Sequence, residues 1–195
     1  MIGIIIVLSS FFIGSIPFGK IVANFKGIDI TKHGSGNIGA TNVFRIIGKK
    51  YGLMVLFLDA LKGFLPTYSA IFLTKDPTIV VICGFAAIMG HMFSPFLNFK
   101  GGKGVATGVG VFLAISPRIF ILALILGLLI IALTQYVSLG SLTGSLFFVI
   151  LMFRSGQPPQ YSIMASIVAV FILIKHIPNI KRLLNGEENK LSWTK

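Results

Sequence analysis

The chain has 195 residues, of which 55% are hydrophobic and 11% are charged, and its mean hydropathy is +0.94. This composition excludes an ordinary water-soluble domain of this size, so lipid is the expected solvent for most of the chain. The net charge of +12 does not indicate a nucleic-acid binder, because such proteins carry Lys and Arg on a polar surface that this sequence lacks. Anionic lipid headgroups and phosphorylated substrates are the partners that we expect instead.

The N-terminal segment is apolar from residue 2 to residue 23, and its first positive charge, Lys20, comes only near its end. A secretory signal would begin with basic residues, so we expect an uncleaved membrane span. Cys83, the only cysteine, lies within an apolar run, which provides no disulfide framework and favours a buried, inert thiol.

Seven apolar segments follow one another along the chain, separated by Gly, Pro, Asn and charged residues: 2–23, 53–73, 78–97, 105–116, 119–137, 139–153 and 161–177. A helix needs about 20 apolar residues to cross the hydrocarbon core, so the segments predict an all-α, polytopic membrane protein with about seven transmembrane helices in a single domain, 1–195. The two short segments, 105–116 and 139–153, are expected to be half-length or tilted helices beside a polar site. A five-span arrangement remains open.

The basic residues are distributed unequally between the two sides of this arrangement. With the N-terminus outside, the outer side receives three of them: Lys75, Arg118 and Arg154. The cytoplasmic side receives twelve: Lys26, Lys32, Arg45, Lys49, Lys50, Lys100, Lys103, Lys175, Lys181, Arg182, Lys190 and Lys195. Because cytoplasmic loops carry the excess of Lys and Arg, we expect the N-terminus outside and the C-terminus inside.

The first connection, residues 24–52, is much longer than the others and long enough to be functional. Three glycines in it permit positive backbone dihedrals: Gly34, Gly36 and Gly39. Uncharged hydrogen-bonding side chains lie among them: Ser35, Asn37, Thr41 and Asn42. If residues 40–47 form a short helix, Thr41 and Arg45 share one face beside the glycine turn, an arrangement that can hold an anion. The alternative is a flexible loop with scattered polar residues.

The segment 98–110 contains a second glycine turn, in which Gly101, Gly102 and Gly104 surround Lys103 immediately before an apolar helix. Backbone N–H groups at the start of a helix suit a phosphate group. The spacing of a Walker A loop is absent, so ATP is not an expected substrate. The alternative is a set of glycines that let helices pack closely, beside ordinary positive-inside residues.

Two further polar clusters lie at the same expected membrane edge. Ser138 and Ser141 open the sixth span, and Lys175, His176 and Asn179 close the seventh, where Pro178 should end or kink the helix near Ile177. Each cluster taken alone is typical of helix capping.

Asp59 and Lys62 lie inside the second span at spacing i, i+3 and are expected to form a structural ion pair, with a catalytic role as the alternative. His33 and His91 have no neighbouring set of Cys, His, Asp or Glu at metal-ligand spacing, so we expect no metal and no other cofactor.

Four motifs of the chain, taken together, resemble the bacterial acyl-phosphate:glycerol-3-phosphate acyltransferases, the PlsY family. They are GSGNIGATNVFR, GHMFSPFLNFKGGKGVAT, SLGS and HIPNIKRLLNGEE, and they have the family's order, separation and membrane setting over nearly the full chain. The resemblance implies transfer of a fatty acyl group from acyl phosphate to the sn-1 hydroxyl of glycerol 3-phosphate, forming lysophosphatidic acid and phosphate, the first step of phospholipid synthesis. It also implies a bacterial cytoplasmic (inner) membrane, with the active site facing the cytoplasm.

The resemblance also assigns roles to individual residues. The catalytic set that it implies is Ser35, Arg45, Lys103, His176 and Asn179. The residues expected to bind substrate phosphate are Gly36, Asn37, Thr41, Asn42, Gly101, Gly102, Gly104, Ser138 and Ser141. Glu188, like Asp59 and Lys62, is expected to be structural. Thr31 stands where family members often have arginine, and the next residue, Lys32, is expected to compensate.

The expected partners are acyl phosphate, glycerol 3-phosphate and membrane lipids, and the chemistry is compatible with a monomer. Acyl phosphate is already activated, so the protein has to orient an alcohol and neutralise crowded phosphates. The His-x4-Asp pair of soluble acyltransferases is missing, which leaves His176 or a substrate phosphate oxygen to accept the hydroxyl proton, and geometry favours the phosphate. The alternative function is an organophosphate transporter or anion channel, which the polar clusters at one membrane edge disfavour. A non-catalytic binder of anionic lipid would not require glycines beside hydroxyl groups.

Overall fold

The computed structural model describes residues 2–191, so Lys195, counted above among the cytoplasmic residues, lies outside the described part of the chain. Within residues 2–191 the secondary structure consists of α-helices and two short 3-10 helices, without strands. The expectation of an all-α protein is therefore confirmed. The chain forms two compact units, residues 1–115 and residues 116–195, and each is described by itself. The single domain expected from the sequence remains a prediction.

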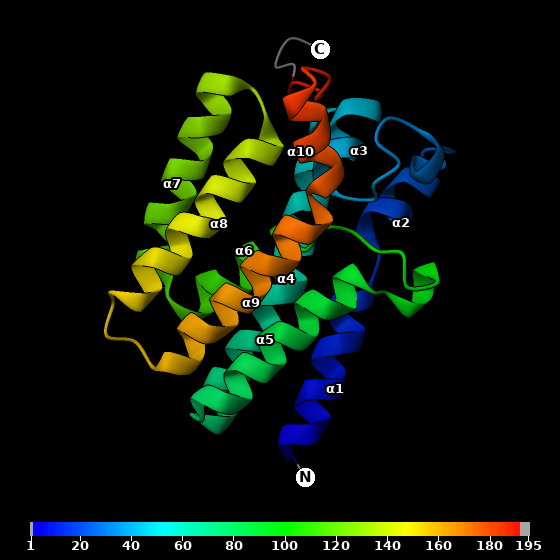
Figure 1. The fold of residues 1–195 in the computed structure, drawn as a ribbon. Helices are drawn as coiled ribbons and strands as arrows, with labels where there is room; N and C mark the ends of the chain where they lie inside the picture. Colours follow the sequence, from blue (N-terminus) through cyan, green and yellow to red (C-terminus); the bar gives the residue numbers. More distant parts are fainter. Residues whose placement is uncertain (1, 192–195) are drawn as a thin grey trace. The chain divides into compact units, whose positions relative to one another are not determined.

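Unit 1 contains six α-helices and two 3-10 helices within its described residues (Figure 1). They are α1 (Ile2–Ser15), α2 (Phe18–Asn24), η1 (Ile30–Lys32), α3 (Ala40–Ile46), α4 (Lys49–Thr74), α5 (Pro77–Met92), η2 (Pro95–Leu97) and α6 (Val105–Ile115). Unit 2 contains α7 (Pro117–Thr134), α8 (Val137–Phe153), α9 (Pro159–Lys175) and α10 (Ile177–Leu184) in the part that the structure describes.

Each apolar segment expected from the sequence contains a helix of the structure. Four stretches of the described residues are long and apolar enough to cross a membrane: Gly3–Asn24, Lys49–Thr74, Pro77–Leu97 and Pro117–Thr134. The pair α9 and α10, bent by 56°, is a fifth candidate if it is one broken span. The helices α6 and α8 are apolar but shorter, as expected for these two segments. The count of seven spans and the orientation of the chain remain predictions.

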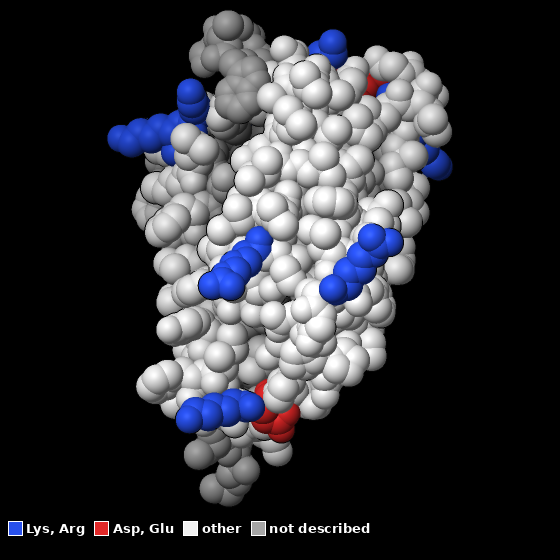
Figure 2. Space-filling view, turned by 90° about the vertical axis from the view of Figure 1, so that its left-hand side faces the viewer, with Lys and Arg blue, Asp and Glu red and all other residues white. Residues whose placement is uncertain are grey.

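Large apolar side chains point outward from the membrane-length helices. Phe57 and Phe72 on α4 are 64% and 74% exposed, and Leu133 on α7 is 73% exposed. Figure 2 shows one face of the molecule on which charged side chains are sparse over a wide uncharged surface. Such a surface would be unfavourable in water and suits contact with lipid tails.

Glycines allow the helices of unit 1 to cross at short distance. A Cβ atom at Gly14 of α1 would overlap the carbonyl oxygen of Ala87 on α5, and one at Gly110 of α6 would overlap the carbonyl oxygen of Ala60 on α4. Small residues at such crossings are typical of helices that pack in a membrane, where close van der Waals contact replaces the hydrophobic effect.

The first span is broken between α1 and α2. Pro17 has no N–H group, and the two carbonyl groups before it accept hydrogen bonds from side chains elsewhere in unit 1. The Ser94 hydroxyl donates to the carbonyl oxygen of Ser15 (2.7 Å), and the Lys62 ammonium donates to that of Ile16 (2.7 Å). The break is therefore fixed by α4 and by the residues that follow α5.

A second break separates α9 from α10. Helix α9 ends at Lys175, and α10 begins at Ile177 with Pro178 in its first turn. The predicted effect of Pro178 is confirmed, because the two helices meet at 56° beside His176.

Candidate functional site

The first glycine loop, residues 33–39, is organised by the buried side chain of Asn42. Its Oδ1 accepts a hydrogen bond from the backbone N–H of Ser35 (3.1 Å). Its Nδ2 lies 3.0 Å from the carbonyl oxygen of His33, 2.9 Å from that of Asn37 and 3.4 Å from that of Ile30. Asn42 is 2% exposed, so one amide side chain links three points of the loop backbone to one another and to Ile30 of η1. The sequence predicts that Asn42 binds a substrate phosphate. The structure shows in addition that its side chain holds the loop backbone in place.

Glycine is required at two positions of this loop. Gly34 and Gly36 have φ angles of 60° and 69°, in the left-handed region that residues with a Cβ atom rarely adopt. At Gly34 a Cβ atom would also overlap the Oδ1 atom of Asn42. The loop can therefore close around Asn42 only with glycine at this point.

The expected polar residues of the first loop lie near its glycines. Asn37 Oδ1 accepts from the backbone N–H of Gly39 (2.8 Å), which leads into α3. Helix α3 contains Thr41 and Arg45 four residues apart, so the short helix predicted for this segment is confirmed. The side chains of Thr41 and Arg45 are half-buried, and Ser35 is exposed.

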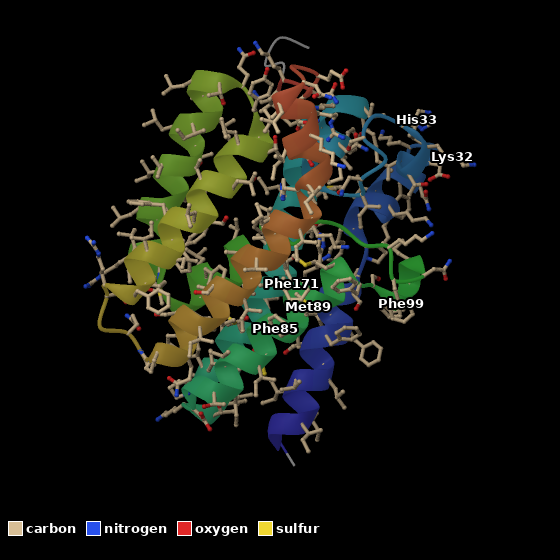
Figure 3. The ribbon with its side chains drawn as sticks, in the orientation of Figure 1. Lys32, His33, Phe85, Met89, Phe99 and Phe171 are labelled. Atoms are coloured by element: carbon tan, nitrogen blue, oxygen red, sulfur yellow. The ribbon has the colours of Figure 1, made fainter. Side chains whose placement is uncertain are left out.

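The outer edge of the first loop is polar. Figure 3 shows Lys32, the last residue of η1, and His33 at this edge. The Thr31 hydroxyl and backbone N–H donate to Asp29 Oδ1 (2.6 and 3.2 Å), and these hydrogen bonds, with the nearby Lys32, lower the pKa of the exposed Asp29 carboxyl group. Lys32 also pairs loosely with Asp29 at 3.7 Å.

The second glycine loop, residues 98–104, is held by backbone hydrogen bonds to the end of α5. The N–H groups of Gly101 and Gly102 donate to the carbonyl oxygens of Met92 and His91 at the end of α5, both at 3.1 Å. Gly104, with φ of 81°, then turns the chain into α6. The half-buried Lys103 thus lies between two fixed glycines at the start of a helix, as the sequence predicts.

The two glycine loops lie on the same side of unit 1. Figure 1 shows both away from the N-terminus and from the α4–α5 turn. A small apolar cluster lies beside both: Ile30 of η1, Ile38 of the first loop and Val43 of α3 are buried in it, and Leu97, the residue before the second loop, packs against it. Residues of both glycine-rich motifs therefore pack on one shared apolar cluster.

A buried ion pair lies in α4. The Lys62 ammonium is 2.7 Å from Asp59 Oδ1, and both side chains are 2% exposed. The pairing expected from their spacing is present. The Asp59 carboxylate also faces His91 of α5, with 3.8 Å between Oδ1 and Nδ1, a contact that the sequence analysis did not foresee.

In unit 2 the polar residues gather around Glu188. Its Oε1 accepts hydrogen bonds from Ser138 Oγ (2.9 Å) and Asn179 Nδ2 (2.6 Å), and its Oε2 accepts from Arg182 Nε (2.8 Å). Burial alone would raise the pKa of this carboxyl group, but the hydrogen bonds from Asn179, Arg182 and Ser138 and the charge of Arg182 outweigh burial and lower it. Glu188 is thus an ionised anchor, consistent with the structural role expected for it.

His176 lies buried at the break between α9 and α10. Its Nδ1 is 2.8 Å from the carbonyl oxygen of Ile172, and since a carbonyl group only accepts, Nδ1 carries the proton. In the neutral ring Nε2 is then the acceptor atom. Ser141, the other serine of the SLGS motif, donates to the Val137 carbonyl oxygen of its own helix (2.8 Å).

The expected site residues therefore fall into two groups. Ser35, Arg45, Lys103 and both glycine loops lie in unit 1, whereas Ser138, Ser141, His176 and Asn179 lie in unit 2. Within residues 2–191 no group of three or more His, Cys, Asp or Glu side chains is placed to hold a metal ion, and the absence of a metal remains a prediction.

Comparison with known proteins identifies the family. The family model for glycerol-3-phosphate acyltransferase matches residues 4–186. A glycerol-3-phosphate acyltransferase of Aquifex aeolicus is 41% identical over 191 residues, covering 97% of this chain and 100% of the relative. One of Desulforamulus reducens is 45% identical over 197 residues, covering 98% and 96%.

Two solved structures are similar over nearly the whole chain. Both are crystal structures of PlsY (YgiH), described as an integral membrane glycerol 3-phosphate acyltransferase, one in the glycerol 3-phosphate form and one in the lysophosphatidic acid form. Their TM-scores are 0.95 and 0.92, each at 40% identity and covering 98% of this chain and 96% of the other. The chain therefore belongs to the glycerol-3-phosphate acyltransferase family and is an integral membrane enzyme of that family.

Proposed function

We propose that this enzyme transfers a fatty acyl group from acyl phosphate to the sn-1 hydroxyl of glycerol 3-phosphate, releasing lysophosphatidic acid and inorganic phosphate. The observation that carries the proposal is the pair of glycine loops on one side of unit 1, with Lys103 between fixed glycines of the second loop and Arg45 on the helix that follows the first. The similar solved structures, in glycerol 3-phosphate and lysophosphatidic acid forms, support the acceptor and the product.

The reaction needs little covalent chemistry from the protein. The sn-1 oxygen attacks the acyl carbonyl carbon, a C–O bond forms, and the bond between the carbonyl carbon and the phosphate oxygen breaks. Phosphate leaves with the bonding electron pair as a stable anion, so no acyl-enzyme is required. Because both reactants carry phosphate, the main task of the site is to neutralise crowded negative charge, and Lys103 and Arg45 suit this task.

The glycine turns and hydroxyl groups would orient the two phosphates. Ser35 is exposed at the tip of the first loop, next to Gly36 and Asn37, where it can meet a ligand from solution. Thr41 and Asn42 would complete the first phosphate site, and Gly101, Gly102 and Gly104 the second. We assign Ser138, Ser141 and Asn179 to the orientation of substrate, Ser141 by direct contact and the other two through Glu188, to which they donate hydrogen bonds.

The hydroxyl proton passes to an oxygen of the leaving phosphate or to His176. The ring of His176, with its proton on Nδ1, has the acceptor atom Nε2 that a base requires. A His176→Asn enzyme that loses little turnover at saturating substrate would support the phosphate oxygen as the proton acceptor. Complete loss of turnover with substrate binding intact would show that His176 accepts the proton.

We place the enzyme in a bacterial inner membrane with its site facing the cytoplasm. The excess of Lys and Arg on one side of the expected spans supports this orientation. Both glycine loops fall on that side, where soluble glycerol 3-phosphate would reach them.

The deciding experiment mixes the purified protein with palmitoyl phosphate and glycerol 3-phosphate. Formation of lysophosphatidic acid and phosphate in equal amounts is the expected result, and palmitoyl-CoA in a parallel reaction tests the other activated donor. The competing function, an organophosphate carrier, predicts flux of glycerol 3-phosphate into liposomes without product.

A further inference from the structure

The ion pair of Asp59 and Lys62 requires a physical explanation beyond the pairing itself. Both side chains are 2% exposed and belong to a helix that is long and apolar enough to span a membrane. Removing two charges from water is expensive, and a buried pair is often no more stabilising than well-packed apolar residues of similar volume. Charged residues within a membrane span usually have a functional role in addition to a structural one.

Each member of the pair makes a contact outside α4. Lys62 Nζ donates to the carbonyl oxygen of Ile16 (2.7 Å), which directly precedes Pro17 at the break between α1 and α2. The Lys62 ammonium also lies 5.6 Å from the centre of the Phe18 ring, at the start of α2. On its other side, the Asp59 carboxylate faces His91 Nδ1 at 3.8 Å.

His91 connects the ion pair to the second glycine loop. A Cβ atom at Gly102 would overlap the Nε2 atom of the His91 ring, so the imidazole lies directly against the loop backbone. The carbonyl oxygen of His91 accepts the N–H of Gly102 at 3.1 Å, and the next carbonyl group, of Met92, accepts that of Gly101. One residue therefore contacts the loop through both its ring and its backbone.

We propose that Asp59, Lys62 and His91 form a buried positioning cluster that fixes the second glycine loop, and with it Lys103, relative to the α1–α2 break. The cluster joins α4, which carries the ion pair, to α5, which carries His91. It contacts the break through Lys62 and the loop through His91. It rests on the proposed function in one respect, which is that Lys103 binds a substrate phosphate. Asp59, Lys62 and His91 would act through the loop and would not touch substrate.

The test separates this role from a purely structural one. In the double variant Asp59→Asn/Lys62→Met no unpaired buried charge remains, so a pair that only stabilises the fold predicts near wild-type kinetics. A positioning cluster instead predicts that the KM for glycerol 3-phosphate or for palmitoyl phosphate rises about tenfold or more, because misplacement by about 1 Å is costly at a substrate site. The thermal midpoint in detergent should stay near that of the wild type.

A second variant, His91→Leu, removes the ring that links the pair to Gly102. It should raise the same KM, and in the background of the double variant it should add less than about twofold, because the link is already cut. Thr67→Val is the matched control, since Thr67 is buried on α4, donates to the Gly63 carbonyl group of its own helix and lies beside Gly84 of α5. It should leave both KM values unchanged.

Three results would overturn the inference: wild-type KM values in the double variant, a fall in thermal midpoint and kcat with KM unchanged, or fully additive effects of His91→Leu. If the double variant does not fold, the KM of the single variant His91→Leu decides alone. A wild-type enzyme that forms no lysophosphatidic acid would instead refute the proposed function. Product formation with unchanged KM in the variants refutes only the positioning role.

Discussion

The first glycine loop of unit 1 and the C-terminal segment of unit 2 are each held by one buried polar side chain, but the partners of these two side chains differ. Among the described residues, the partners of Asn42 are backbone groups, namely the N–H of Ser35 and three carbonyl oxygens. Glu188 accepts from three side chains, those of Ser138, Asn179 and Arg182.

This difference determines what each region tolerates. A neutral amide among backbone groups does not depend on neighbouring side chains or on pH. It is hard to replace, because it combines an acceptor oxygen with an NH2 group that has two N–H donors. A carboxylate among side chains has stronger, charge-assisted bonds, yet it depends on its own ionisation and on each donor. Changes at the two anchors should therefore have different consequences.

The largest expected effect comes from Asn42→Asp. The carboxylate keeps the acceptor for the Ser35 N–H but places a negative oxygen against carbonyl groups that lose their donor, at about 1–3 kcal/mol for each unsatisfied group. Because the first loop would move, we expect kcat/KM for glycerol 3-phosphate to fall at least about 100-fold. The measurement is steady-state kinetics of purified enzyme. Asn24→Asp, which adds a charge at an exposed residue of α2, is the control and should retain wild-type activity. A fall in kcat/KM of less than about threefold in Asn42→Asp would contradict the scaffold role.

A smaller effect is expected from Glu188→Gln. The amide oxygen can still accept from Ser138 and Asn179, but the amide NH2 group would face the Arg182 donor. Loss of this charge-assisted bond should cost about 2 kcal/mol of stability and loosen the segment around residue 188. Faster proteolysis of the C-terminal segment, with a lower thermal midpoint, would be the observation. Glu187→Gln, at the exposed neighbouring residue, should change neither quantity.

The two serines of the SLGS motif provide a finer comparison. Ser138 donates to Glu188, whereas Ser141 bonds only the Val137 carbonyl group of its own helix among the contacts described for it. We expect Ser138→Ala to reduce stability by about 1 kcal/mol and Ser141→Ala to raise a substrate KM by about fivefold, the size of one neutral hydrogen bond. Thermal midpoints and KM values of both variants test the assignment, and the reverse pattern would assign the phosphate contact to Ser138.

The sequence predicts much of this fold because hydropathy and proline act locally. Each apolar segment contains a helix, the two short segments form the short helices α6 and α8, and Pro178 ends α9 beside His176. The predicted glycine turn before α6 is also confirmed, because glycines followed by an apolar run indicate both a turn and the start of a helix.

The anchors of the site could not be predicted from local pattern. Asn42 bonds carbonyl groups whose positions exist only once the loop has closed, and Ser138 meets Glu188 across a sequence separation of 50 residues. No positioning role was expected for His91, although it lies within the motif GHMFSPFLNFKGGKGVAT. Its contact with Gly102 depends on how the loop returns to α5. Glycine at 102, where a side chain would collide with the ring, is the only local signal of that contact.

The smallest expected effect is the pH dependence that distinguishes the two anchors. Because the pKa of Glu188 is lowered in the folded protein, its stabilising contribution is complete above the ordinary carboxyl pKa of about 4.3 and is lost as the pH falls through the lower folded-state pKa. The difference in thermal midpoint between wild type and Glu188→Gln should therefore shrink from pH 7 to pH values below about 4, whereas the difference for Asn42→Ala should stay constant because an amide does not titrate. If the difference in thermal midpoint between wild type and Glu188→Gln stays constant or widens in acid, the carboxylate is not the ionised anchor of its segment.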